Sequence, residues 1–125
     1  MKTVKVSTDN TVSLIDIDFD SYREIRNAIG GHFETVRTRR SASYFGSPDI
    51  VMLVDEEGLL KDLPENMFGC VMYGTAEHGH PIVGDPILAG IVGEDITAPD
   101  DAEALKSKLL RDFPLLMEGK EHGRN

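Results

Sequence analysis

The sequence predicts an α+β domain, with a mixed or mostly antiparallel sheet of about five strands and two to three helices. Two observations favour this class: short apolar runs of strand length, and segments whose apolar residues recur at helical spacing. The length of 125 residues fits one core. We therefore expect a single domain over residues 1–117, followed by a flexible polar tail at 118–125.

The chain opens with a predicted hairpin. Val4 and Val6 alternate with polar neighbours, and residues 12–19 are rich in β-branched side chains. Asp9-Asn10 lies between the two segments and is typical of a turn.

A helix is predicted next. Ser21 and Glu24 have the spacing of a capping box, in which a hydroxyl and a carboxylate satisfy free N–H groups of the first turn. Gly30-Gly31 can adopt the left-handed conformation that ends a helix. Three apolar side chains of this helix share one stripe and are expected to pack against the core: Tyr22, Ile25 and Ile29.

The middle of the chain predicts two strands separated by a loop. Residues 32–37 alternate imperfectly, and residues 38–49 are polar with a glycine and a proline, which favours a mobile loop. Residues 50–54 are continuously apolar, so we expect a central strand buried on both faces. The acidic turn at 55–58 closes this strand.

The second half predicts a short helix, a strand and a longer helix. Residues 63–66 are expected to start the short helix, which Gly74 ends, and residues 75–81 form a loop. Residues 82–92 have strand character, but Pro86 cannot donate to a ladder, so the strand is expected to start after it. The last helix is predicted to open at Thr97 and to end before Pro114.

Composition excludes several functional classes. The formal net charge is −9 and the pI is about 4.8, which argues against a general nucleic-acid coat or a binder of anionic membranes. No apolar run approaches the length that spans a bilayer, and the first ten residues lack the apolar core of a signal peptide. Cys70 is the only cysteine, so no internal disulfide is expected. These features predict a cytoplasmic protein that needs no cofactor to fold.

Three sequence motifs follow one another along the chain. They are Ile29-Gly30-Gly31, then VDEEGLLKDLPEN at 54–66, then IVGDPILAG at 82–90. In this order they resemble the family called domain of unknown function 3846, over most of the chain up to the last helix. The resemblance implies occurrence in phages, plasmids and bacterial genomes. It implies no activity and no catalytic residue, and it does not extend to the loop at 38–49.

Two acidic segments have alternative interpretations. Asp16, Asp18 and Asp20 would share one face of a strand, where they could hold Mg²⁺ or form a solvated face that keeps an edge strand from pairing. We favour the solvated face, because the spacing places no further ligands. The second segment either complements a helix N-terminus or imitates nucleic acid toward a host protein; its members are Glu94, Asp95, Asp100, Asp101 and Glu103.

Recognised catalytic motifs are absent from the sequence: there is no nucleophile elbow, P-loop, dinucleotide-binding motif or zincin helix. His78 and His80, with Asp85 five residues further on, could bind Zn²⁺ or Ni²⁺, although a structural zinc site usually has four ligands. Cys70 has apolar neighbours and is expected to be buried and inert. A small metal-dependent enzyme with a site near these histidines and Asp85 is therefore the alternative function.

One basic segment opposes the overall acidity of the chain. Arg37, Arg39 and Arg40 place three guanidinium groups within four residues, and Tyr44 lies close enough in sequence to stack on a ligand. The competing interpretation is that these arginines pair with carboxylates of the same protein. We take these four residues as the candidate ligand-binding site.

The function that the sequence favours is that of a small accessory or binding protein of mobile-element type. Its expected partner is either another protein or a small anionic ligand. Extended DNA and membranes are not expected partners, since long-range attraction for a polyanion is poor at this net charge.

Overall fold

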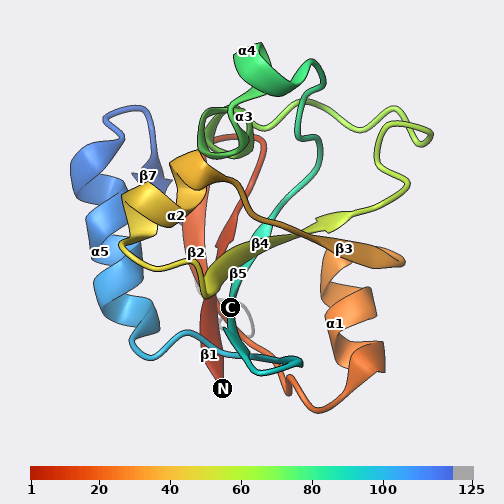
Figure 1. Ribbon diagram of the computed structural model, residues 1–125, viewed down its shortest axis with the longest axis vertical. Helices are drawn as coiled ribbons and strands as arrows, with labels where there is room; N and C mark the ends of the chain where they lie inside the picture. The colour runs from red at the N-terminus through yellow and green to blue at the C-terminus, as the bar shows by residue number, and fades with distance from the viewer. Residues whose placement is uncertain (120–125) are drawn as a thin grey trace.

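Residues 1–119 are described by a computed structural model, in which seven strands form one sheet (Figure 1). The order is β3-β4-β5-β1-β2-β7, and β6 pairs with β5. All neighbours are antiparallel except β2 and β7, which are parallel. The α+β class and the mostly antiparallel sheet are thus confirmed, with more strands and helices than expected. The strands are β1 (Lys2–Val6), β2 (Thr11–Asp16), β3 (Phe33–Val36), β4 (Ile50–Asp55), β5 (Ile87–Val92), β6 (Asp95–Thr97) and β7 (Met117–Glu118).

Helices cover the two faces of the sheet unequally. The helices are α1 (Tyr22–Ile29), α2 (Arg39–Phe45), α3 (Met67–Tyr73), α4 (Thr75–His78) and α5 (Ala102–Asp112). Residues of α2, α3 and α5 belong to the core on one face of the sheet, and residues of α1 belong to the core on the other. Figure 1 shows α1 on the opposite side of the sheet from α2 and α5. No helix within residues 1–119 is long and apolar enough to cross a membrane.

The predicted hairpin and central strand are both present. In the hairpin Val6 pairs with Val12, and Asn10 takes the positive φ of 70° that its tight turn requires. Strand β4 lies between β3 and β5, and its residues 51–54 are buried. Strand β5 starts at Ile87, directly after the proline, as predicted.

Helix α1 begins and ends where the sequence predicts. The Ser21 hydroxyl accepts from the N–H of Glu24, and Gly30 ends the helix at φ 104°. The Glu24 carboxylate accepts from the N–H of Asp18 rather than from Ser21, so it ties the preceding turn to the helix. Ile25 is buried, whereas Tyr22 is 54% exposed and contacts the Phe33 ring. The prediction that Tyr22 packs in the core is therefore wrong.

The predicted mobile loop at 38–49 contains helix α2, so that prediction is wrong. Thr38 and Ser41 form a capping box in which each side chain accepts from the backbone N–H of the other residue. Phe45 and Tyr44 pack against the core, and Gly46 ends the helix in the left-handed conformation. The sequence analysis did not recognise this capping box, because its third helical position is Ser41 rather than the usual Glu or Gln.

Three further boundaries differ from the predictions. Helix α3 starts at Met67 rather than within residues 63–66, because Asn66 is its N-cap. The expected loop at 75–81 contains the short helix α4. The last helix starts at Ala102, capped by Asp101, since residues 95–97 pair with β5 instead of opening the helix.

Residues 117–119 are held to the sheet. Glu118, the first residue of the predicted tail, belongs to β7, and the N–H of Gly119 donates to the carbonyl of Val12. The rest of the predicted tail, residues 120–125, lies outside the described residues.

A buried asparagine connects α3 to two strands. Asn66 is 1% exposed, and its side-chain amide donates to the carbonyls of Val6 and Gly84, both at 3.0 Å. Its side-chain oxygen accepts from the N–H of Gly69, which caps α3. All three of the side chain's bonds are therefore made to backbone groups that strand pairing and helix bonds leave free.

We predict that Ile25→Ala lowers the free energy of unfolding by about 2–5 kcal/mol, because it removes a buried side chain that joins α1 to the sheet. Chemical denaturation measures the change. An unaltered midpoint would contradict the packing of α1 described above.

We predict that Asn66→Ala destabilises the protein by about 2–4 kcal/mol, because it removes a helix cap and leaves two buried carbonyls without donors. Ser21→Ala is the matched control: it removes a cap at the exposed start of α1 and should cost only about 1 kcal/mol. Equal losses in the two variants would show that the contacts of Asn66 to Val6 and Gly84 contribute little.

Candidate functional site

Two segments that the sequence analysis treated separately meet at Gly74, between α3 and α4. A Cβ atom at this position would lie 3.4 Å from Nε of Arg40, 3.6 Å from Cδ2 of His78 and 3.8 Å from the Glu77 carboxyl carbon. Gly74 also has φ 86°, which ends α3 and lets α4 begin at once. The basic segment and the histidine segment therefore share one surface.

An ion pair joins the two segments directly. Nη2 of Arg40 donates to Oε1 of Glu77 at 2.8 Å, and both side chains are exposed. The hydrogen bond and the positive charge of Arg40 lower the pKa of Glu77 below its ordinary value. Helix α2 is itself tied to α3, because the Thr38 hydroxyl donates to the carbonyl of Met72 at 3.1 Å.

Tyr73 lies between the two predicted histidines. Its ring centroid is 4.8 Å from that of His78 and 4.9 Å from that of His80, and both ring pairs are tilted. The Tyr73 hydroxyl and Nε2 of His80 are 2.8 Å apart and share a hydrogen bond. The sequence analysis missed Tyr73, although its position next to Gly74 and ahead of the histidine segment was a usable signal.

The other two arginines differ in their partners. Nη1 of Arg37 donates to the carbonyl of Pro48 at 2.8 Å, which holds the end of β3 to the segment after α2. Arg39 is exposed and has no partner among residues 1–119. Helix α2 has no acidic residue in its first turn, so its own sequence supplies no carboxylate there to Arg39 or Arg40.

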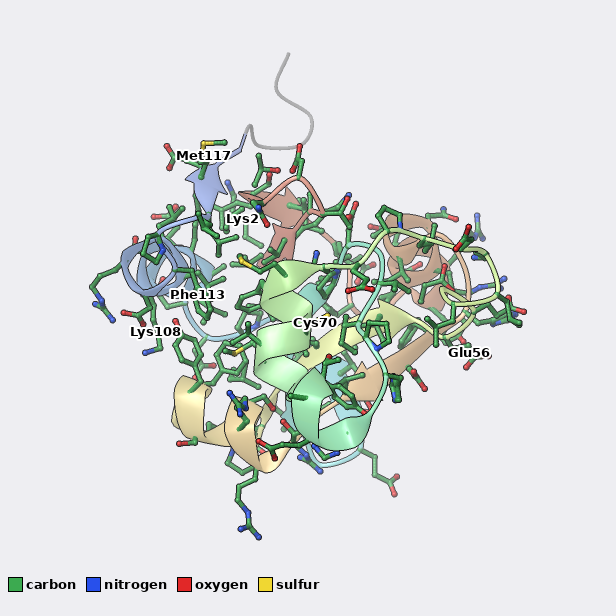
Figure 2. All side chains as sticks on the ribbon, turned by 90° about the horizontal axis from the view of Figure 1, so that it is seen from above. Lys2, Glu56, Cys70, Lys108, Phe113 and Met117 are labelled. Atoms are coloured by element: carbon green, nitrogen blue, oxygen red, sulfur yellow. The ribbon has the colours of Figure 1, made fainter. Side chains whose placement is uncertain are left out.

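We call this surface the α2–α4 face. Figure 2 is viewed from the side on which α3 and α4 lie, with α2 beside them. Its members that contact one another are Arg40, Tyr73, Glu77, His78 and His80, and we include Arg37 and Arg39, which flank Arg40 in sequence.

Tyr44 is directed toward α5 rather than toward the arginines. Its hydroxyl donates to Asp112 at 2.8 Å, and its ring packs edge-on against Phe113. Nζ of Lys108 lies 4.4 Å from the ring centroid. Burial, followed by the hydrogen bond to Asp112, raises the pKa of Tyr44 well above its ordinary value. The structure thus places Arg40 beside Glu77, Arg37 beside the Pro48 carbonyl and Tyr44 at the α2–α5 contact.

Asp85 does not join the histidines. Its carboxylate accepts from the backbone N–H of Thr8 at 3.0 Å and lies 3.9 Å from Nζ of Lys5. Within residues 1–119, no three His, Cys, Asp or Glu side chains are grouped so that they could hold a metal ion. The ligands expected for a metal-dependent enzyme are therefore not brought together.

Asp16, Asp18 and Asp20 do not all lie on one strand. Strand β2 ends at Asp16, whose carboxylate binds the amino group of Met1 at 2.6 Å, and this contact lowers the pKa of Asp16. The Asp18 carboxylate accepts from the N–H of Asp20, which forms a turn. All three side chains are exposed, which fits the solvated face that the sequence analysis favoured.

Cys70 is half-buried on α3, near the centre of the view in Figure 2. Its thiol lies 3.5 Å from the carbonyl oxygen and 3.4 Å from the backbone nitrogen of Ile82. These contacts give the sulfur a structural role between α3 and the segment that precedes β5.

Comparison with known proteins places the chain in a family. The model of the domain of unknown function 3846, DUF3846, matches residues 1–111 of the 125, and the chain belongs to this family. No curated protein and no solved structure matches it.

We predict that Arg40→Gln raises the pKa of Glu77 toward its ordinary value, because the substitution removes the hydrogen bond and the charge that lower it. In the wild type this pair stabilises the fold above the ordinary pKa of a glutamate, and that stabilisation is lost as the pH falls through the lowered value. Carboxyl-carbon NMR titration measures the pKa, with Asp112, which is paired with Arg111, as the internal control. An unchanged Glu77 titration would contradict the pairing.

Proposed function

We propose that this DUF3846 protein is a binding module that takes a compact, phosphate-bearing ligand on its α2–α4 face. The observation that carries the proposal is the Arg40–Glu77 ion pair, which joins the arginine segment and the histidine segment into one surface. A guanidinium group presents paired N–H donors that match the oxygen atoms of a phosphate.

Two neighbouring arginines support the proposal, one without a protein partner among the described residues and one held by an ion pair. Arg39 is exposed and has no protein partner within residues 1–119, so its donors are available to a ligand. Arg40 is held by Glu77 through one of its nitrogens, which fixes its orientation and leaves other donors of the fork unused. Pre-ordering of a side chain reduces the entropy that binding has to overcome.

The flanking rings extend the chemistry of the face. Tyr73 and the two histidines form a group of three neighbouring rings, joined by the Tyr73–His80 hydrogen bond. Aromatic rings stack on the planar parts of ligands, and histidines add donors next to the arginines. A ligand with both a phosphate and a planar group would therefore use the face most fully.

The net charge argues for a compact ligand. At −9 the protein as a whole repels a polyanion, so affinity has to come from short-range hydrogen bonds rather than from long-range attraction. Extended DNA would place many phosphates outside the three arginines. We assign this binding role to the cytoplasm and to an accessory protein of mobile-element type, in keeping with the occurrence that the sequence resemblance implied.

We predict that the triple variant Arg37→Gln, Arg39→Gln and Arg40→Gln loses at least about tenfold in affinity for inorganic pyrophosphate and ADP, because it removes the bidentate donors. Isothermal titration calorimetry measures the affinities. Thermal stability should change little, since the arginines that it replaces are exposed. The wild type should show a shallow salt dependence and no binding to duplex DNA.

The matched control is Arg23→Gln, which removes an exposed arginine on α1, the helix on the other face of the sheet. It should bind both probes as the wild type does. If the triple variant binds pyrophosphate and ADP as well as the wild type, or if the wild type binds neither, the α2–α4 face is only a solvated surface.

A further inference from the structure

The loop between β4 and α3 is held in one conformation by many short contacts. Asp55 accepts from the N–H of Glu57 and from Nζ of Lys61, at 2.9 and 2.7 Å, and Nζ of Lys61 also donates to the carbonyl of Gly30. Within the loop, the N–H of Lys61 donates to the carbonyl of Glu57, and the N–H of Leu63 donates to that of Gly58. We refer to residues 56–63 as the 56–63 loop.

Close packing fixes the base of this loop. A Cβ atom on Gly58 would lie 2.7 Å from a methyl carbon of Val83, so only glycine allows the loop to approach this closely. Leu63 is half-buried, and its side chain reaches both Gly58 and Gly84. One of the three leucines of the loop therefore anchors it to the domain.

The other two leucines face solvent. Leu59 is 58% exposed and Leu60 is 86% exposed, although they lie in a loop whose backbone is well bonded. Single exposed apolar residues are common, but two adjacent large ones on an ordered loop resemble the anchors that protein interfaces bury. A rigid loop also loses little entropy when a partner covers it.

Carboxylates surround the two leucines. Residues 55–65 contain five acidic residues and one basic residue, Lys61. Lys61 is paired with Asp55, so the remaining four carboxylates have no ion pair within the described part of the chain. They belong to Glu56, Glu57, Asp62 and Glu65.

We infer that the 56–63 loop is a docking site for a protein partner that has an apolar pocket with a basic rim. Leu59 and Leu60 fill the pocket, and the acidic neighbours pair with the Lys and Arg side chains of the rim. The loop borders the α2–α4 face at His80, which lines a pocket together with Glu56 and Leu59, and none of the three arginines lines that pocket. In Figure 2, Glu56 of the loop lies at the opposite end of the molecule from Lys108 of α5.

The experiment selects peptides from a random phage-displayed library on the immobilised full-length protein. A synthetic, fluorescently labelled copy of the most enriched peptide is the probe for anisotropy titrations. We expect the peptide to combine large apolar residues with Lys or Arg. We expect Leu59→Ser with Leu60→Ser to weaken its binding at least about tenfold, as for the loss of interface anchors.

Two further variants separate the apolar and the charged contributions. Glu56→Gln with Glu57→Gln keeps both leucines and should weaken binding a few-fold, with a smaller salt dependence than in the wild type. Leu115→Ser is the matched control, because Leu115 is 67% exposed and lies beyond α5. It should leave the affinity unchanged. Circular dichroism melting confirms that each variant is folded.

Two results would overturn the inference. One is that no peptide is enriched on the wild-type protein. The other is that the enriched peptide binds the double leucine variant as tightly as it binds the wild type. Neither result depends on phosphate binding at the α2–α4 face, so this test and the calorimetry fail independently.

Discussion

The hydrogen bonds of the Asn66 side chain connect β1, the segment before β5 and α3, and the arrangement of these three segments depends on them. The side chain is buried, and it satisfies the end of β1, the segment before β5 and the start of α3 at the same time. An apolar residue of similar size would leave two carbonyls and one N–H buried without partners, which costs more than most single contacts gain. This one amide therefore fixes where α3 starts relative to β1 and to the segment before β5.

The same arrangement explains how an acidic protein keeps a local basic surface. Helix α3 packs on the sheet through Phe68 and Met72, and its C-terminal end delivers Tyr73 and α4 next to the first turn of α2. Glu77 of the α2–α4 face is paired with Arg40. The 56–63 loop precedes Asn66 in sequence, and its residues Glu56 and Leu59 line a pocket with His80.

Most of the fold could be predicted from local patterns, and the failures have physical causes. The hairpin, α1 and β4 have strong signals: alternation, caps and a continuous apolar run. Helix α2 was missed because its polar sequence is organised by Thr38 and Ser41 and by packing on α3, which local composition does not reveal. Strand β6 has three residues and pairs with β5, which directly precedes it in sequence, and β7 has two residues and depends on pairing with the distant β2.

The candidate site could be predicted only in part. The arginine segment and the two histidines were recognised as unusual, but nothing in their spacing showed that Arg40 meets Glu77 across 37 residues. Spacing also suggested that Tyr44 belongs with the arginines and Asp85 with the histidines. In the structure the Tyr44 hydroxyl donates to Asp112 of α5 instead, and the Asp85 carboxylate accepts from the N–H of Thr8. Neighbours in sequence diverge when they lie on different sides of a helix or of a turn.

The most direct test of the α2–α4 face as one binding surface is an NMR titration of the labelled protein with inorganic phosphate. The account predicts that the amide signals of Arg39 and Arg40 in α2 and of Gly74 and His78 around α4 shift together, with one common dissociation constant, while those of α1 stay in place. Shifts confined to one of the two segments, or spread evenly over the protein, would contradict it.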